Sequence, residues 1–391
     1  MTKATMATRK EIITRSRIKY KRAKKKGKGL ILDGVCLATG LSRSRIKHLL
    51  WGNIEVRPKT VKHGKLGRKP KYDAPTITVL KYIWALMDFP CGQRLTIAMP
   101  DIITALIRFK EIDIDPDIQY KLQDMSSSTV DRLLKQAKEQ MRFKRGISTT
   151  KPGTLLKRNI PIRLETEWDD AIPGYVEMDL VAHCGDTAAG DYLNTLDITD
   201  ICTGWTETQA AFNKAQKHIF GALLYAKERL PFPLRGIDSD NGSEFINDHL
   251  YRYCREQGIC FTRSRPYRKN DNCHVEQKNW HIVRRNIGYD RYEGNTALTV
   301  MNEYYALLRL YTNFFQPQTK LISKQREGAH IHKYYEVPET PYRRVLRSEG
   351  ITDEEREKLQ ELYVTLNPAE LKRNMMRLSE RLKQLRMLPG I

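Results

Sequence analysis

Hydrophobic and polar residues alternate along residues 175–181, which places Glu177 and Asp179 on one face and apolar side chains on the other. Alternation with a period of two predicts a β-strand with one buried apolar face. Four further segments, with β-branched or aromatic residues, also predict strands: 191–199, 203–211, 234–240 and 259–262. Helices are predicted between them at residues 215–230 and 243–257, so this region is expected to be an α/β unit.

Near the N-terminus, residues 35–50 predict two helices separated by a turn at Gly40. The second helix is expected to begin at Ser42, with its apolar residues facing inward. This is the arrangement of a helix-turn-helix, and an ordinary helical hairpin is the alternative. Three cations of the second helix would then face DNA: Arg43, Arg45 and Lys47.

Lysine and arginine dominate residues 9–28. We expect a phosphate-contacting arm here, although a solvated, partly disordered helix would have the same composition. A second basic run, with Gly and Pro, follows at residues 59–72. Its Arg68 and Lys69 suit an extended linker that follows the minor groove or the backbone of DNA, and a simple flexible linker is the alternative.

Residues 76–145 show helical spacing of their apolar positions, which we expect to form a core: Ile77, Leu80, Ile83, Trp84 and Met87. The hydroxyl run that starts at Ser126 predicts the beginning of another helix, with Lys135 and Lys138 further along it. Together these segments suggest a second helix-turn-helix module. Residues 146–172 are expected to link it to the α/β unit.

The C-terminal region predicts a helix at residues 295–315, whereas residues 316–344 carry no clear pattern. Thr352 opens a capping box for a helix that ends near residue 366, and Asn367 with Pro368 caps a final helix. That helix has a short heptad seam: Leu371, Met375, Leu378, Leu382 and Leu385. Two heptads suit either a partner helix in an oligomer or packing within the same chain.

The chain is strongly basic, with 68 Lys and Arg against 46 Asp and Glu and a net charge of +22 in 391 residues. Such an excess favours a polyanionic partner, since cations bind phosphates and release counterions. The seven cysteines show no spacing typical of a zinc site, and we expect them to be reduced in a cytoplasmic protein. No apolar run has membrane-spanning length, so no membrane partner is expected.

Three acids occupy motifs of a recognisable order. Asp179 lies in the alternating strand, Asp240 ends the strand predicted at residues 234–240 and precedes Asn-Gly, and 35 residues separate Asp240 from Glu276. This pattern resembles the catalytic core of the DDE transposases and retroviral integrases over roughly residues 173–290. In that family, aspartates on two strands and a glutamate on a later helix hold the metal ions of phosphodiester chemistry.

The resemblance implies a ribonuclease-H-like core with a mixed five-stranded sheet, and Asp179, Asp240 and Glu276 as catalytic residues and metal ligands. Hard oxygen ligands select Mg²⁺ or Mn²⁺, and two ions would neutralise the repelling carboxylates and activate a hydroxyl for in-line displacement. Water would cut the element end, and the released 3′-hydroxyl would join it to target DNA.

Other acids compete for these roles. Asp238 shares a strand face with Asp240, and Glu177 shares one with Asp179, so each is the alternative ligand at its position. The remaining acids of the region are expected in turns or at the surface: Asp186, Asp191, Asp197 and Asp200. His183 and Cys184 could be mistaken for a metal or thiol pair, but a loop or core role is expected.

Basic residues before and after Glu276 are expected to contact DNA: Arg263, Arg265, Arg268, Lys269 and Lys278. The strand-transfer integrases often carry lysines one and two turns after the glutamate. This chain has Trp280 and Val283 there, which puts the details of DNA-end contact in doubt.

The expected protein is multidomain, α and α/β, with helix-turn-helix modules, a catalytic core and a helical C-terminal region. Its expected parts are a basic arm and DNA-binding domain (1–58), a basic linker (59–75), a second helical DNA-binding domain (76–145), a linker (146–172), the catalytic core (173–290) and the C-terminal region (291–391). The expected function is that of a bacterial insertion-sequence transposase, a nucleoid-associated homo-oligomer on double-stranded DNA of element ends and target. A metal-dependent nuclease without strand transfer and an inactive DNA-binding regulator are the alternatives.

Overall fold

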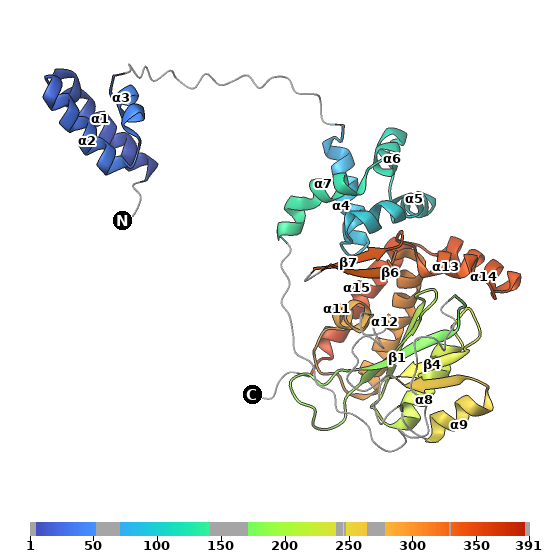
Figure 1. Cartoon of the computed structure of the whole chain (residues 1–391). Helices are drawn as coiled ribbons and strands as arrows, with labels where there is room; N and C mark the ends of the chain where they lie inside the picture. The colour runs from blue at the N-terminus through green and yellow to red at the C-terminus, as the bar shows by residue number, and fades with distance from the viewer. Residues whose placement is uncertain are drawn as a thin grey trace. The chain divides into compact units, whose positions relative to one another are not determined.

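The structure is a computed structural model that describes residues 5–51, 71–140, 171–239, 245, 248–263, 278–327 and 330–387. The chain divides into two compact units, residues 1–71 and residues 72–391 (Figure 1). Asp240 and Glu276 lie outside the described residues, as do residues 59–70 of the predicted basic linker and residues 146–170 of the second.

The described residues of the first unit form three helices: α1 (Met6–Arg22), α2 (Lys25–Thr39) and α3 (Arg43–Trp51). Gly40 ends α2 with a left-handed φ of 67°, a conformation that glycine adopts without strain, and α3 follows as predicted. Residues 9–28 are not an arm, because Ile13 and Tyr20 bury their side chains in the core of this unit. The role of α2 and α3 as a DNA-binding helix-turn-helix stays a prediction.

The second unit is built around a five-stranded sheet in the order β3-β2-β1-β4-β5. Its strands are β1 (Tyr175–Ala182), β2 (Asn194–Asp200), β3 (Thr206–Ala211), β4 (Gly236–Ser239) and β5 (Cys260–Arg263). β2 pairs antiparallel with both β1 and β3, whereas β1, β4 and β5 are parallel. The predicted mixed five-stranded sheet is therefore confirmed.

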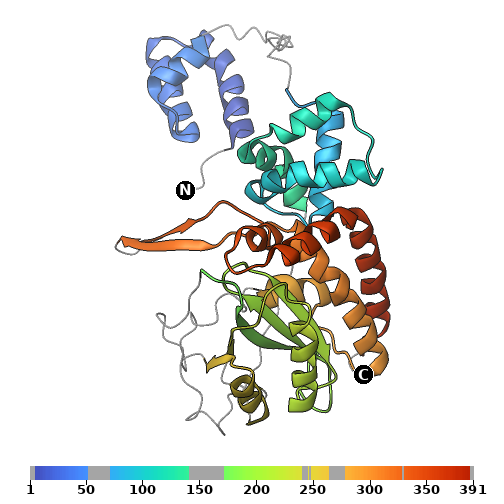
Figure 2. The ribbon, with the colours of Figure 1, turned by 90° about the vertical axis from the view of Figure 1, so that its right-hand side faces the viewer.

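Helices cover both faces of this sheet. α8 (Gln216–Lys227) and α9 (Asp248–Glu256) pack on the apolar face, where Val176 and Met178 of β1 lie in one hydrophobic cluster with both helices. The long helix α12 (Gly294–Phe315) lies on the other face (Figure 2). There Tyr305 shares a hydrogen bond of 2.6 Å with Thr195 of β2.

Two asparagines of α12 satisfy the outer edge of β3. Asn313 accepts from the Thr206 N–H and donates to the Thr206 carbonyl, both at 2.9 Å. Asn302 does the same at Ala210, with distances of 2.8 and 3.3 Å. A side chain that pairs the backbone of an edge strand prevents that edge from pairing with another chain.

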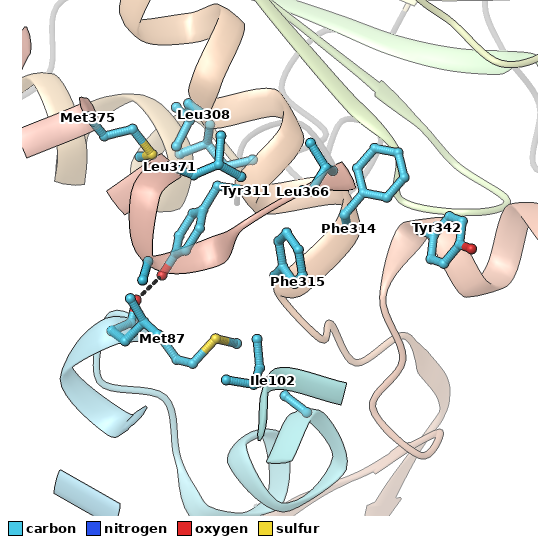
Figure 3. Packing of buried hydrophobic residues seen from close by; sticks show 14 of the residues in the cluster. Met87, Ile102, Leu308, Tyr311, Phe314, Phe315, Tyr342, Leu366, Leu371 and Met375 are labelled. Atoms are coloured by element: carbon cyan, nitrogen blue, oxygen red, sulfur yellow. Dashed lines mark hydrogen bonds between the residues drawn. The ribbon is translucent and has the colours of Figure 1, made fainter. Parts of the chain in front are cut away.

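A second group of helices precedes the sheet in sequence: α4 (Ala74–Leu86), α5 (Gly92–Arg108), α6 (Pro116–Gln123) and α7 (Ser127–Gln140). They share one hydrophobic cluster with α12 and α15 (Pro368–Gln384) (Figure 3). The Tyr311 hydroxyl donates to the Leu86 carbonyl at 2.6 Å across this boundary. Residues 76–140 and the C-terminal helices, predicted as separate parts, thus contribute to one core.

The predicted helix starts are confirmed where a side chain caps them. Thr352 accepts from the Glu355 N–H at the start of α14 (Asp353–Thr365), and Asn367 accepts from two N–H groups at the start of α15. Ser126 likewise accepts from the Thr129 N–H at 3.3 Å. The sequence did not predict the hairpin of β6 (Leu321–Glu327) and β7 (His330–Tyr335), or the short α13 (Pro341–Arg347).

The heptad seam of α15 packs within the chain. Leu371, Met375 and Leu382 are buried in the cluster shared with α12, and Leu378 and Leu385 pack against it. An apolar stripe that is covered by its own chain has no surface left for a partner helix. The heptad seam is therefore no evidence for the predicted homo-oligomer.

Five cysteines of the described residues are free thiols, as expected: Cys36, Cys91, Cys184, Cys202 and Cys254. Among the helices that the structure describes, none combines the length and apolar composition needed to cross a membrane.

Met375 and Met376 offer a matched test of this packing, since their exposed fractions are 1% and 60%. Met375→Ala should lower the free energy of unfolding by roughly 2–5 kcal/mol, because it leaves a cavity between α12 and α15. Met376→Ala should change it by less than about 0.5 kcal/mol. Urea unfolding measures both, and light scattering should give the same mass for wild type and both variants. A lower mass for Met375→Ala would instead indicate a seam between subunits.

Candidate active site

Four carboxylates lie on the sheet face that α12 covers. Asp179 of β1 is directly opposite Asp197 of β2, and Glu177 of β1 is directly opposite Asp238 of β4. Residues opposite each other in neighbouring strands have their side chains on the same face of the sheet. The sheet therefore gathers these acids from three adjacent strands.

Asp179 differs from the other three in its exposure. Glu177, Asp197 and Asp238 are fully buried, whereas Asp179 is half-buried. Asp238 accepts a hydrogen bond of 2.6 Å from the Thr262 hydroxyl of β5. Asp179 is therefore the acid of this face that a substrate could reach, and Asp238 is held within the sheet.

Two donors fix the Asp179 carboxylate. The Leu180 N–H donates to Oδ1 at 2.7 Å, and the side-chain amide of Asn279 donates to Oδ2 at 2.5 Å. Asn279 begins η1 (Asn279–Arg284), a π-helical stretch that continues into α11 (Arg285–Ile287). Such stretches within helices occur often at functional sites. The helix that the sequence predicts to carry Glu276 thus contacts Asp179 through its described part.

Fully buried Asp197 and half-buried Lys278 are a pair of interacting ionisable groups beside Asp179. Burial raises the pKa of Asp197, and burial lowers the pKa of Lys278, so both are pushed toward their neutral forms. The Lys278 amine donates to the Gln318 side chain at 2.5 Å and to the Gly204 carbonyl at 3.2 Å. Neither Asp197 oxygen has a hydrogen-bond partner among the described residues.

The expectation that Asp197 lies in a turn or at the surface is wrong, because it is fully buried within β2, whereas Asp200 lies at the β2–β3 turn as expected and is also fully buried. Asp200 accepts from the Gly174 N–H at 2.8 Å and from the N–H and hydroxyl of Thr203, both at 2.7 Å. It thus joins the β2–β3 turn to the start of β1, and burial raises its pKa to about 6. An Asp three residues before Thr-Gly is typical of such a turn and could have indicated this role.

The predicted DNA contacts have four different outcomes. Arg43, Arg45 and Lys47 are exposed on α3 as expected, although Arg43 is paired with Asp33. Arg263 is not on an exposed loop, because it is buried at the end of β5. The Lys278 amine is bonded to protein acceptors, and its contact with DNA stays a prediction. The others lie outside the described residues: Arg68, Lys69, Arg265, Arg268 and Lys269.

A cationic cavity that the sequence did not predict lies within the first unit. Its volume is about 640 Å³, and the first turns of α2 and α3 line it. Its polar lining consists of Tyr20, Lys25, Lys28, Arg43, Ser44 and Lys47. Lys24, which caps α2, makes no side-chain bond to the free N–H groups there, so these groups and the helix dipole add positive potential.

His183 belongs to the core, as expected. It is fully buried, shares a hydrogen bond of 2.7 Å with the Thr195 hydroxyl, and packs edge-on against Tyr292. Burial, together with the charge of Arg284, lowers its pKa to about 3. His183 is therefore neutral and is no part of the acidic site.

The chain is 36% identical over 344 residues to the uncharacterized protein y4rM of Sinorhizobium fredii (strain NBRC 101917 / NGR234). The match covers 87% of this chain and 95% of that protein. The chain belongs to the y4rM family. No protein-family model matches it.

Solved structures similar to this y4rM-family chain include the catalytic core domain of BIV integrase, with 16% identity, a TM-score of 0.28, and coverage of 44% of this chain and 91% of that one. The HTLV-2 integrase catalytic core in complex with magnesium, in its dimeric form, has 16% identity, a TM-score of 0.29, and coverage of 38% and 93%.

His183 predicts a pH dependence of stability. An unfolded chain takes up a proton near the ordinary histidine pKa of 6.5, whereas buried His183 resists protonation to about pH 3. The contribution of neutral His183 to the free energy of unfolding is complete above pH 6.5 and is lost as the pH falls toward 3. Between pH 6.5 and 5, wild type should lose about 2 kcal/mol more stability than His183→Gln.

Urea unfolding at several pH values measures this difference. The control is His249→Gln on α9, because His249 is exposed and its variant should follow the wild-type profile. Parallel profiles for wild type and His183→Gln would contradict the neutral, buried histidine.

Proposed function

We propose that this chain is a DNA transposase of the DDE type, which binds element ends, cuts DNA there and joins the ends to target DNA. The observation that carries the proposal is the half-buried Asp179 on the central strand, held by two donors on a face that gathers three more acids. Cytoplasmic action on the nucleoid and assembly into a multimer on paired ends are parts of the same proposal.

The sheet register supports Asp240 as the second ligand. Met178 of β1 is directly opposite Ser239 of β4, and these are the residues immediately before Asp179 and Asp240 in the sequence. Because β1 and β4 run parallel in this register, the strand residues that lead into Asp179 and into Asp240 lie side by side at the same end of the sheet. Asp238, two residues before Asp240, is committed to Thr262 within the sheet.

The contact of Asn279 with Asp179 supports Glu276 as the third ligand. Asn279 follows Glu276 by three residues, close to one helical turn, and its amide reaches Asp179 at 2.5 Å. Residues three or four apart share a helix face. In a helix that extends back from Lys278, Glu276 and Asn279 would point the same way.

The residues fit a hard divalent cation. Carboxylate oxygens are the ligands that Mg²⁺ and Mn²⁺ prefer, and acids this close repel one another until cations neutralise them. Asp179, Asp240 and Glu276 would hold two such ions, which would supply Lewis-acid activation of the attacking hydroxyl and stabilisation of the leaving oxygen. Asn279 would keep one Asp179 oxygen oriented, and Lys278 would hold the start of its helix against the β2–β3 turn.

Variants of the three acids test this function. Asp179→Asn, Asp240→Asn and Glu276→Gln preserve shape and remove a negative charge, so each should abolish both end cleavage and strand transfer. The assay is cleavage and joining of a labelled element end in Mg²⁺ or Mn²⁺. Joined products separate a transposase from a nuclease of the same fold, and metal-dependent cleavage by wild type excludes an inactive regulator.

Asp238→Asn is the matched control. Asparagine keeps an oxygen that can accept from the Thr262 hydroxyl, so this variant should fold and retain substantial activity. If Asp240→Asn cleaves normally and Asp238→Asn does not cleave, the second metal ligand is Asp238 and not Asp240. Cleavage by all four variants at the wild-type rate would refute the triad.

The charge distribution supports DNA binding by the first unit. Residues 1–71 contain 22 of the 68 Lys and Arg and three of the 46 Asp and Glu, so they hold 19 of the 22 net positive charges. Within this unit, two helix starts and four cations surround the cavity of about 640 Å³. Free N–H groups, lysines and a hydroxyl are the donors that bind phosphate oxygens. We propose that this cavity holds the DNA backbone.

Lys28 and Lys47 test the role of the cavity. The double variant Lys28→Gln and Lys47→Gln should weaken duplex binding and reduce the slope of log affinity against log salt by about two, because two phosphate contacts are lost. The control is Lys10→Gln with Arg15→Gln, two exposed cations of α1 that do not line the cavity. Equal effects of both pairs would show that the cavity is not the contact. Equal binding of element-end and random duplexes at all salts would contradict recognition of the ends.

A further inference from the structure

A small pocket lies where α5, the C-terminal half of α12 and the helix formed by η1 and α11 meet. Its volume is about 30 Å³, and the ionisable side chains that line it include Asp88, Arg94, His281 and Arg285. A bound water needs roughly 10–15 Å³ of such space, so the pocket admits one or two atoms of the size of oxygen. We call it the Arg94 pocket.

Cations dominate the Arg94 pocket. Arg94 donates to the Thr319 hydroxyl at 3.4 Å, and Arg285 donates to the Asp88 carbonyl. Neither guanidinium forms an ion pair within the part of the chain that the structure describes. The carboxylate of Asp88 is already bonded to the Lys372 amine at 2.5 Å. Cations held close together repel one another unless an anion neutralises them, so the pocket favours an anionic ligand.

His281 adds an unused polar group to the pocket. Its side chain is half-buried, and neither ring nitrogen has a hydrogen-bond partner among the described residues. Burial and the charges of three nearby cations lower the pKa of His281 to about 4: Arg285, Lys278 and Arg94. The ring is therefore neutral at neutral pH, and one of its nitrogens carries a hydrogen that it can donate. An imidazole that lines a pocket without a protein partner is available to a ligand.

The turn between α4 and α5 fixes the position of Arg94. Asp88 and Phe89 both adopt a left-handed φ of 59°, a conformation that costs free energy in residues other than glycine and is found often at functional sites. Tyr311 and Gln316 hold this turn, since their side chains donate to carbonyls at the C-terminal end of α4 at 2.6 and 3.0 Å. Arg94 lies in the first turn of α5, directly after this turn, and is therefore positioned before any ligand binds.

The Arg94 pocket and the candidate active site share one helix. Asn279, at the start of η1, donates to Asp179 at 2.5 Å, and His281 follows two residues later. Lys278, which precedes Asn279, donates at 2.5 Å to the Gln318 side chain, and Gln318 also lines the pocket. DNA that is bound at Asp179 would therefore lie next to the pocket.

We propose that the Arg94 pocket is a phosphate subsite, in which Arg94, His281 and Arg285 bind the oxygens of one backbone phosphate of the DNA at Asp179. A guanidinium presents several N–H donors in one plane, which matches the geometry of phosphate oxygens. The pocket has no room for a sugar or a base, so this contact fixes the position of the strand without reading its sequence. The inference rests on the proposed function, because it names where the DNA of that function is held.

Chemical footprinting of the full-length wild-type chain tests the subsite directly. Phenylglyoxal modifies accessible arginines, and mass spectrometry gives the extent of modification at each one. A saturating DNA duplex, without divalent metal, should protect Arg94 and Arg285. Arg255 should stay reactive, because it is exposed on α9 at the opposite face of the sheet. An Arg94 that stays reactive at saturation would overturn the subsite.

Inorganic phosphate is the second footprinting reagent, and it separates a DNA phosphate from a free anion. It should protect Arg94 only at concentrations far above those at which the duplex does, since it lacks the other contacts of a DNA strand. Protection by inorganic phosphate without protection by the duplex would assign the pocket to a small free anion and would also overturn the subsite.

The variant Arg94→Gln tests whether the contact contributes to binding. The slope of log affinity for the duplex against log salt should become less steep by about 0.9, because one phosphate contact is lost. Arg94→Lys keeps the charge and should retain the wild-type slope, as should the charge-matched control Arg255→Gln. Equal slopes for wild type and Arg94→Gln would contradict the subsite. If Arg94→Gln fails to fold, footprinting of the wild-type chain still decides.

The outcome is separable from that of the proposed function. Asp179→Asn, which should not cleave, should still show protection of Arg94 by the duplex. If wild type fails to cleave element ends but the duplex protects Arg94, the subsite stands and the transposase proposal fails. If wild type cleaves and joins while Arg94 stays reactive, the subsite alone is wrong.

Discussion

The second unit depends on the packing of α12 against the sheet. This helix covers the face that carries the acids, pairs the free edge of β3 through Asn302 and Asn313, and presents its opposite side to α4, α5 and α15. A buried ion pair fixes its rotation, since Arg309 donates to the fully buried Glu207 of β3 at 2.7 and 2.9 Å. Breaking a buried ion pair costs up to about 3–5 kcal/mol, and Arg229 at 3.4 Å is a second cation beside Glu207. The position of α12 is therefore strongly determined.

This arrangement explains how a protein can keep several acids on an interior face. Carboxylates are expensive to bury unless hydrogen bonds or cations compensate, and burial of an apolar residue at the same position would stabilise the fold more. Asp200 and Glu207 receive full compensation from protein donors. Asp197 does not receive it from the described residues, and it lies directly opposite Asp179. Departures from the rules of a stable core are expected where function imposes them.

The sequence predicts what local rules decide. The caps at Ser126, Thr352 and Asn367 depend on residues within three positions, and the strands around Asp179 follow from alternation over seven residues. The burial of Asp197 is not local, because the helix that covers it lies about a hundred residues further along the chain. For the same reason, no sequence pattern reveals that Tyr311 bonds to Leu86, 225 residues away.

Two further differences have their own physical causes. In residues 9–28, the cations outnumber the apolar residues, so that the core positions Ile13 and Tyr20 do not form a visible stripe. In the hairpin, both faces are solvated, and a bulge at Ile322 interrupts the alternation that would predict a strand. Patterns reveal an element when one of its faces is buried, and an element that projects into solvent leaves no such signal.

The uneven charge of the two units places a constraint on any DNA that reaches Asp179. The first unit holds 19 of the 22 net positive charges, so the second unit attracts a polyanion only through local features. A second contact on the same molecule benefits from the high effective concentration that the first contact creates, and it can be weak on its own. Under the proposed function, weak local contacts of the second unit would then decide where the strand lies, while the first unit would supply most of the affinity. Sequence-independent attraction and precise placement can thus be adjusted separately, because different residues provide them.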